Sequence, residues 1–299
     1  MSKAGFRAFF FLVVLIATTS AFGQLKQPIL TPERVQARKE LGQLSIQYTT
    51  EAFVSAAANG DTFAVQLFLK AGMSPGVATD ADMTPLLAAA VHGQLETIKS
   101  LVAGGADPNR TGRTAVNGYY SEPLAEGARL ERKDIVQFLL NNGADPNVDQ
   151  GDALKAAIST GNLEIVKLLL SKGMTLKNGP WVLYAASKSL NLVSLLVDAG
   201  AQVAVQDSYG ATPIMNAASR DIAGYLLDRG ADVNKVSTNG NTALKNAIFR
   251  NNVEFARFLI DKGADVNLHQ PAPYETPLGL AEQMKNADMV ALLVKAGAK

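Results

Sequence analysis

The sequence predicts an all-α solenoid of about eight helix-turn-helix repeats joined by short β-turn loops. One observation is a pentapeptide, Gly-Ala-Asp-Val-Asn or Gly-Ala-Asp-Pro-Asn, which occurs at 105–109, 143–147, 230–234 and 263–267. A second is a triplet resembling Thr-Pro-Leu, which stands 21 residues before most of the glycines that open these phrases. A third is the spacing of apolar residues between these landmarks, at three and four positions, which is typical of amphipathic helices.

The glycine that opens the phrase also recurs in weaker copies, at steps of 27 to 38 residues along the chain. Such an internal period identifies a repeat array, in which each unit packs on its neighbours. We therefore expect one repeat domain over residues 49–299. Its units are predicted near 51–80, 84–113, 122–150, 152–179, 180–210, 212–240, 242–275 and 276–299.

Each unit carries the signals of two helices and two turns. In Thr84-Pro85-Leu86 the threonine can cap the first free amides, and proline fits the first helical position. Paired small residues such as Ala88 and Ala89 let neighbouring helices approach closely. The second helix ends at a glycine that can adopt the left-handed conformation. The following Asp and Asn predict a tight turn held by side-chain bonds to nearby backbone.

The stretches 81–109 and 241–267 resemble ankyrin repeats, whose period is about 33 residues. The resemblance covers roughly residues 49–299, and it implies a module that binds proteins through turn tips and first-helix ends on a concave face. The histidine that usually follows Thr-Pro-Leu in this family is missing throughout. The unit that starts at Pro180 has lost its Thr-Pro start, and the unit at Thr212 has a shortened turn between its helices, so these two units are expected to be the least regular.

The first 23 residues differ in kind from the rest of the chain. Lys3 and Arg7 precede an apolar run over 8–17, and small and polar residues follow up to Gly23. This order is typical of a secretory signal peptide, so we expect cleavage before Gln24 and a periplasmic or secreted protein with no membrane insertion after signal removal. The alternative is an uncleaved membrane anchor, although about 20 apolar residues are needed to span a bilayer.

Residues 24–48 lie between the predicted signal peptide and the repeats. The segment from Thr31 to Leu41 has its own threonine cap and a proline start, so it predicts one further helix. Terminal units of repeat arrays need a polar outer face. We therefore expect 24–48 to be a capping segment that shields the first repeat.

Composition narrows the classes of function. The 28 basic and 27 acidic residues nearly balance, and removal of the signal leaves a net charge of about −1, which gives no electrostatic footprint for nucleic acid. Cysteine is absent, which excludes disulfides and thiol catalysis. His92 and His269 are far apart in the repeat order and neither has a third ligand nearby. We therefore expect no metal site, no cofactor and no catalytic residues.

The linker before Glu122 is five residues longer than the equivalent linkers and contains Arg and Tyr residues, the types most enriched at interface hot spots. We expect its arginines and tyrosines to form one patch with His92 and Arg129; the alternative is a slack loop with one tyrosine folded back on the helices. First-helix ends and other turn tips supply the remaining candidates. The predicted partner-binding residues are His92, Arg110, Arg113, Tyr119, Tyr120, Arg129, Leu130, Tyr209, Phe249, Arg250 and Tyr274.

These observations predict a monomeric, non-catalytic scaffold or accessory protein that is exported and binds a protein partner. An immunity-type inhibitor of a delivered toxin fits the same features. An enzyme is the least supported class, because no set of convergent titratable groups is apparent in the sequence.

Overall fold

The computed structural model describes residues 31–114, 118–177, 179–268 and 276–299. Within them the chain forms seventeen α-helices, one 3-10 turn and a two-stranded hairpin, which confirms the all-α fold class. The elements are α1 (Pro32–Gln43), α2 (Thr50–Ala58), α3 (Thr62–Lys70), α4 (Pro85–Val91), α5 (Leu95–Ala103), β1 (Gly112–Arg113), β2 (Tyr120–Ser121), α6 (Pro123–Arg129), α7 (Lys133–Asn141), η1 (Val148–Gln150), α8 (Asp152–Thr160), α9 (Leu163–Ser171), α10 (Trp181–Ala186), α11 (Leu190–Asp198), α12 (Pro213–Asn216), α13 (Arg220–Leu227), α14 (Ala243–Phe249), α15 (Val253–Asp261), α16 (Pro277–Gln283) and α17 (Ala287–Lys295).

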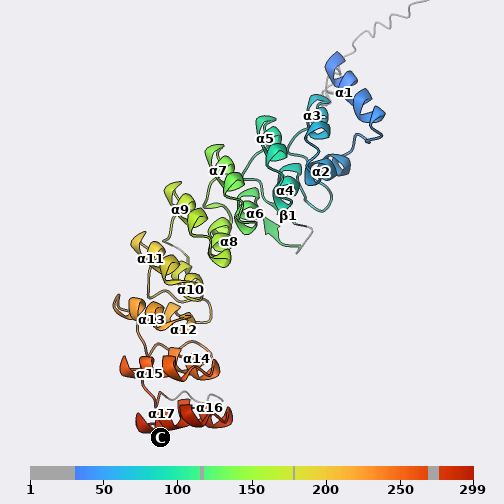
Figure 1. Cartoon of the computed structure of the whole chain (residues 1–299). Helices are drawn as coiled ribbons and strands as arrows, with labels where there is room; N and C mark the ends of the chain where they lie inside the picture. Colours follow the sequence, from blue (N-terminus) through green and yellow to red (C-terminus); the bar gives the residue numbers. More distant parts are fainter. Residues whose placement is uncertain (1–30, 115–117, 178, 269–275) are drawn as a thin grey trace, which may run out of the picture.

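After α1, the helices form consecutive pairs that stack along one direction. First helices contact first helices, from α2 against α4 to α14 against α16, and second helices contact second helices in the same way. Figure 1 shows the resulting curved rod, with α4, α6, α8, α10 and α12 along its concave side and α5, α7, α9 and α11 along the outer side. The hairpin also lies on the concave side, next to α4 and α6.

Local signals explain where the first helices begin. The hydroxyl oxygens of Thr84, Thr242 and Thr276 each accept a hydrogen bond from the amide three residues further on, which satisfies one of the free donors at the helix start. The small side chains of Ala89 and Ala90 are fully buried, so adjacent repeats pack closely. Together with apolar residues of the second helices, they form one hydrophobic core that runs from α1 to α17.

Helix α1 covers one end of the stack. It begins after Thr31, whose side chain accepts a hydrogen bond from the amide of Arg34, and it buries Ala37 and Leu41. Its contacts are with α3, and the Tyr48 hydroxyl donates to the carbonyl of Ala71 at 3.1 Å. The helix thus lies where the sequence predicts one, against the first repeat.

The recurring pentapeptide contains two different hydrogen-bonding devices. The Asp107 carboxylate accepts a hydrogen bond from the amide of Asn109 at 2.9 Å, which closes the turn locally as predicted. The prediction that the asparagine also bonds nearby backbone is wrong. The Asn109 side chain instead donates to the carbonyl of Gly143 at 2.9 Å and accepts from the amide of Asp145 at 2.7 Å, both in the next repeat.

The same bridge recurs further along the rod. Asn234 donates to Gly263 and accepts from Asp265, and Asn267 donates to Gly297 and accepts from Lys299. Asn147 donates to Gly173 and accepts from both the amide and the hydroxyl of Thr175. The asparagine therefore joins consecutive repeats, and this explains why the chain repeats the phrase at a fixed place in the unit.

The two repeats formed by α10–α13 depart from this pattern. Lys177 and Ala204 stand at the positions of the bridging asparagine, α10 has six residues and α12 has four. Trp181 is 3% exposed and packs in the core, and its indole N–H has no hydrogen-bond partner among the described residues. These two units are thus irregular, as expected, because their first helices are short and the bridging asparagine is missing.

None of the helices in the described ranges combines the length and the apolar character needed to cross a bilayer. The predicted signal peptide over 1–23 lies outside the described residues, as do His269 and the candidate residue Tyr274.

Candidate partner-binding surface

The longer linker before α6 contains a β-hairpin, which neither the predicted patch nor the alternative of a slack loop included. Strands β1 and β2 are antiparallel, with Gly112 opposite Ser121 and Arg113 opposite Tyr120. The amide and hydroxyl of Thr114 both donate to the carbonyl of Tyr119, at 3.0 and 3.3 Å. These bonds hold the two sides of the hairpin together beyond the paired strands.

The base of the hairpin is attached to the preceding repeat. The amide of Arg113 donates to the carbonyl of Asp82 at 3.1 Å. A Cβ atom at Gly112 would lie 2.4 Å from that same carbonyl oxygen, so only glycine fits this close approach. Arg110 donates to the carbonyl of Gly76 at 2.5 Å and lies 4.0 Å from the Asp82 carboxylate, so it holds the base of the hairpin.

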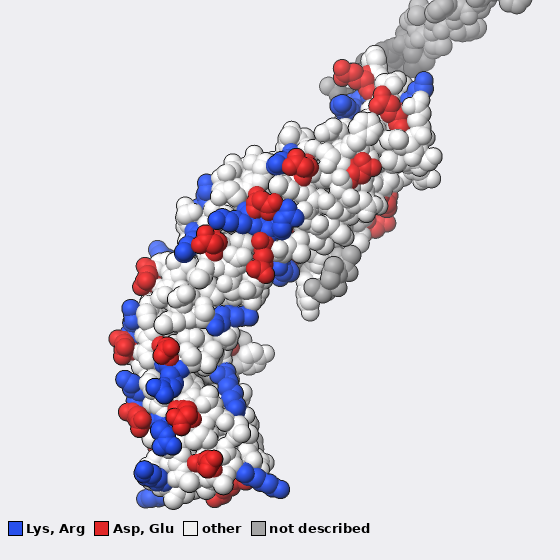
Figure 2. Space-filling model, in the orientation of Figure 1, with Lys and Arg blue, Asp and Glu red and all other residues white. Residues whose placement is uncertain are grey.

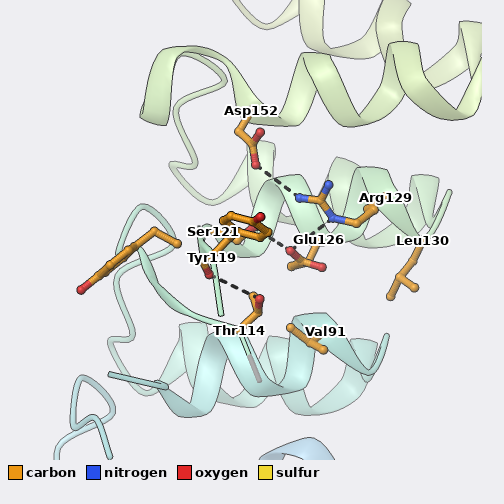
Figure 3. Close-up of a pocket in the computed structure, with 9 residues that line it drawn as sticks. Val91, Thr114, Tyr119, Ser121, Glu126, Arg129, Leu130 and Asp152 are labelled. Atoms are coloured by element: carbon orange, nitrogen blue, oxygen red, sulfur yellow. Dashed lines mark hydrogen bonds and ion pairs between the residues drawn. The ribbon is translucent and has the colours of Figure 1, made fainter. Parts of the chain in front are cut away.

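A cavity of about 460 Å³ opens between the hairpin, α4, α6 and the start of α8. Figure 3 shows Glu126 and Arg129 of α6 on the same side as Asp152, to which Arg129 is bonded, with Val91 and Thr114 on the other side. Its volume is in the range of ligand pockets in proteins. The lining residues are Val91, Thr114, Tyr119, Tyr120, Ser121, Glu126, Arg129, Leu130 and Asp152.

A continuous chain of polar contacts forms one wall of this cavity. The Ser121 hydroxyl donates to the Glu126 carboxylate at 2.6 Å, and the Arg129 guanidinium donates to that carboxylate at 3.4 Å and to Asp152 at 3.3 Å. Glu126 is 7% exposed, so its position is set by packing as well as by these bonds. The wall therefore offers fixed charges of both signs.

The rim of the cavity is apolar and aromatic. Tyr119, Tyr120 and Leu130 are 74%, 55% and 44% exposed. The Arg113 guanidinium lies 5.9 Å from the Tyr120 ring centre, within cation–π range. Aromatic side chains beside polar groups are enriched in protein interfaces. Both tyrosines are more than half exposed, so neither is folded back on the helices.

The expected single patch is only partly assembled. Tyr119, Tyr120, Arg129 and Leu130 line the cavity, and Arg113 lies beside it, but Arg110 is directed to the preceding repeat. His92 makes a 2.9 Å contact with the carbonyl of Ala88 and is not part of the lining.

Other candidates lie further along the rod and do not join this cavity. Tyr209 is 69% exposed in the turn before α12, and Phe249 is 56% exposed at the end of α14. Arg250 donates to the carbonyl of Ala217 at 2.9 Å, so it supports a neighbouring repeat. These residues form separate exposed positions.

Sequence reasoning missed Thr114, Ser121, Glu126 and Asp152 as members of the site. One signal was present: Glu126 stands in α6 at the position that Ala88 holds in α4, inside a run of small and apolar residues. A carboxylate there is costly unless it is hydrogen-bonded.

A second carboxylate, Glu122, is buried at the start of α6. It is 1% exposed, and it makes no cap bond. Among the described residues no donor reaches either carboxylate oxygen with normal hydrogen-bond geometry, and the Ala153 amide is close enough only to favour the charged form. Burial raises the pKa of Glu122 to about 8, with the charges of Asp152 and Asp149 adding to the effect and the Ala153 amide and Lys155 opposing it. Glu122 is therefore mostly protonated at neutral pH.

Charges of both signs are interspersed over the face seen in Figure 2. Among the described residues, charges pair across neighbouring repeats, as Lys133 does with Glu164 at 3.2 Å, or within one repeat, as Arg132 does with Asp134 at 2.7 Å. This face thus carries no broad field of a single sign in the region of α7 and α9.

Comparison with known proteins agrees with this architecture. The sequence profile of the family described as "Ankyrin repeats (3 copies)" matches residues 53–150, 113–179, 181–270 and 236–299. The chain is 34% identical over 127 residues to an ankyrin repeat-containing protein of Treponema pallidum (strain Nichols), which covers 41% of each chain. It is 27% identical over 206 residues to the ankyrin repeat protein YahD of Escherichia coli (strain K12), covering 63% of this chain and all of YahD.

Relatives outside bacteria include a B-cell lymphoma 3 protein homolog of Mus musculus, 28% identical over 229 residues, which covers 70% of this chain and 49% of the relative. The chain spans less than half the length of this relative and of the Treponema protein. Ankyrin repeats are in general protein-interaction modules and not catalysts. The matched repeats extend over most of the chain, and the chain belongs to the ankyrin repeat family.

Proposed function

We propose that this chain is an exported, non-catalytic interaction module that binds a protein partner at the hairpin cavity on its concave side. The observation that carries the proposal is the combination of exposed Tyr119, Tyr120 and Leu130 with the fixed polar chain of Ser121, Glu126, Arg129 and Asp152. Large apolar groups around a few fixed polar groups supply both contact area and orientation.

The hairpin is suited to this role because it is rigidly held yet contributes little to the packed core. Its strands are bonded to each other and its base is bonded to Asp82, so partner binding does not have to order a free loop. Ordering costs reduce affinity, and a preformed hairpin avoids part of them.

Family membership supports a protein partner. One relative, 28% identical over 144 residues and covered to 88% of its length, is named cyclin-dependent kinase 4 inhibitor B of Rattus norvegicus. The name of that relative states that it inhibits a kinase, which is another protein; for this chain we propose only that it, too, acts on a protein partner.

Export is the second part of the proposal, and it rests on the order of basic, apolar and small residues over 1–23. Intact-mass measurement of the protein isolated from its source tests it directly. We expect a mature chain that begins at Gln24, found outside the cytoplasm; a mass that still includes Met1 would contradict export with cleavage.

The binding site is tested by replacing both tyrosines of the rim, Tyr119→Ala with Tyr120→Ala. A photo-crosslinking amino acid placed at Tyr119 first captures and identifies the partner in the native envelope, and the affinity of the isolated pair is then measured. We expect the double variant to bind about thirty-fold more weakly, because truncating an aromatic anchor commonly costs about 2 kcal/mol. Both side chains are exposed, so the melting temperature should stay nearly constant.

The matched control is Tyr209→Ala with Phe249→Ala, two exposed aromatic residues on other repeats. We expect it to bind normally. If the control pair loses affinity and the hairpin pair does not, the partner binds elsewhere on the rod.

A further inference from the structure

A second groove lies on the other side of α8 from the hairpin cavity. It has a volume of about 340 Å³ and lies between α8, α10 and α12. Ile158 and Leu183 are buried at 1% and 4% exposure in its wall, and the Tyr184 ring is 37% exposed beside them. The wall is thus mainly apolar and large enough for one large side chain.

The groove exists because α12 is short. Helix α12 has four residues and ends at Asn216, whereas its neighbour α14 has seven. The final turn, which would cover α10, is therefore absent from α12. The chain turns away at Ala217, whose backbone is no longer helical, with φ −53° and ψ 125°. The amide of Ala218 donates to the carbonyl of Ala186 at 3.0 Å.

Side chains of α14 and its C-cap hold the truncated helix in place. Asn246 donates to the carbonyl of Met215 at 2.8 Å, and Arg250 donates to the carbonyl of Ala217 at 2.9 Å. These bonds satisfy carbonyl groups that a longer helix would have used internally. The opening is therefore a fixed feature of the fold.

Two lysines stand at the groove, Lys155 from α8 and Lys188 after α10. Within the described ranges neither ammonium group has an ion pair or a hydrogen bond. Asp152, one turn before Lys155, is already paired with Arg129. The nearby Glu122 does not compensate Lys155 either, because burial keeps that carboxyl mostly protonated at neutral pH. The groove thus combines an apolar wall with uncompensated positive charge.

We propose that this groove binds an acidic segment of a partner protein, with one leucine-sized or aromatic side chain seated against Ile158, Leu183 and Tyr184 and carboxylates placed at Lys155 and Lys188. Complementary charge fixes the register of such a segment and speeds its association, while the buried side chain supplies the contact area. The site is independent of the hairpin cavity, so its test does not depend on Tyr119 or Tyr120.

The test uses three fluorescein-labelled peptides and fluorescence anisotropy with the full chain. The first is acetyl-Glu-Asp-Leu-Glu-Glu-amide, the second has Ala in place of Leu, and the third has Lys in place of every acidic residue. We expect the first to bind, the second to bind about ten-fold more weakly because it loses the buried apolar side chain, and the third not to bind. Affinity for the first peptide should fall as salt rises.

The variant Lys155→Glu with Lys188→Glu should weaken binding of the acidic peptide at least ten-fold, because two attractive charges become repulsive. The matched control, Lys172→Glu with Lys295→Glu, makes the same change in net charge at the ends of the second helices α9 and α17, and it should bind like the unaltered chain. Should the first variant melt early, Lys188→Gln alone provides the test, with an expected loss of two- to five-fold.

The proposal fails if the basic peptide binds as well as the acidic one, or if both double variants lose affinity equally. Vesicles of phosphatidylglycerol serve as an alternative anionic target. If they bind in a manner that needs Lys155 and Lys188 while the acidic peptide does not bind, the surface contacts a membrane and the proposal is overturned.

Discussion

The central repeats, α10–α13, and the C-terminal repeats, α14–α17, are both built from pairs of helices, but they differ in the hydrogen bonds that cap their first helices and join them to the next repeat. In the C-terminal pair of repeats, Thr242 and Thr276 cap the first helices and Asn234 and Asn267 bridge to the next unit. In the central pair, neither Pro180 nor Thr212 makes a side-chain cap bond, and no asparagine stands at the two bridging positions.

This difference shows what the repeated phrase does for the rod. Where a cap and a bridge are both present, as at α14, the first helix has seven residues, and where both are absent the first helices have only six and four residues. The shortening uncovers a groove on the concave side. Loss of regularity in the middle of the chain is thus linked to the appearance of a distinct surface.

The largest effect should come from the side chain that fills the centre of the irregular region. Trp181→Ala should lower the free energy of unfolding by about 3 to 5 kcal/mol, because it leaves a cavity in the core. Trp181→Phe should cost much less, since it keeps an aromatic ring and removes an indole N–H that has no hydrogen-bond partner in the described residues. Chemical denaturation measures both. Equal losses for the two variants would mean that the N–H has a partner that stabilises the fold.

The next effect concerns Glu122, which occupies at α6 the position where Thr84 caps α4. The pKa of its carboxyl is raised from 4.5 to about 8, so the folded chain binds a proton that the unfolded chain has released between these pH values. Stability from this group is therefore lost as pH rises from about 4.5 to about 8, by roughly 1.4 kcal/mol per pH unit.

Glu122→Gln removes this titration, so the stability of the variant relative to the unaltered chain should grow over that range and level off above pH 8. Denaturation midpoints at pH 5, 6.5 and 8 provide the measurement. Parallel pH profiles for the two chains would show that the Glu122 carboxyl is not perturbed in the folded state. Glu122→Thr is the informative companion, because it can restore the cap as well.

The smallest effects should come from the bridges themselves. Asn234→Ala removes two hydrogen bonds to Gly263 and Asp265 and should cost about 1 to 2 kcal/mol. Ala204→Asn should add a bridge and stabilise by about 0.5 to 1.5 kcal/mol, because Ala204, Gly230 and Asp232 line a small cavity of about 150 Å³ at the empty bridging position. Thermal melts of both variants measure the changes; destabilisation by Ala204→Asn would show that the two turns are not in bridging register.

Much of the fold could be predicted from the sequence, because repeats encode it several times over. Caps such as Thr84, glycines such as Gly105 and the apolar spacing of the second helices are local signals, and local signals are readable. The role of Asn109 could not be predicted, because its partners lie in the next repeat and depend on how two units stack.

The candidate site was predictable only in part. Five extra residues and a pair of tyrosines indicated the hairpin region, but two-residue strands are too short to leave a periodic pattern. Arg110 and Arg129 look alike in sequence, yet one holds the base of the hairpin and the other lines the cavity. Which of them lines the cavity depends on the positions of Asp82 and Asp152 in the folded chain. The residues next to each arginine in the sequence do not determine those positions.

Hydrogen exchange of the free chain, measured by mass spectrometry, tests most directly whether the helix caps and the asparagine bridges determine the local stability of each repeat. Backbone amides exchange through local opening, and opening is easier where fewer contacts must break. We expect faster exchange in α10–α13 than in α14–α15, although the central helices lie further from a chain end. Equal protection across both regions, or protection that declines only toward the ends of the rod, would contradict it.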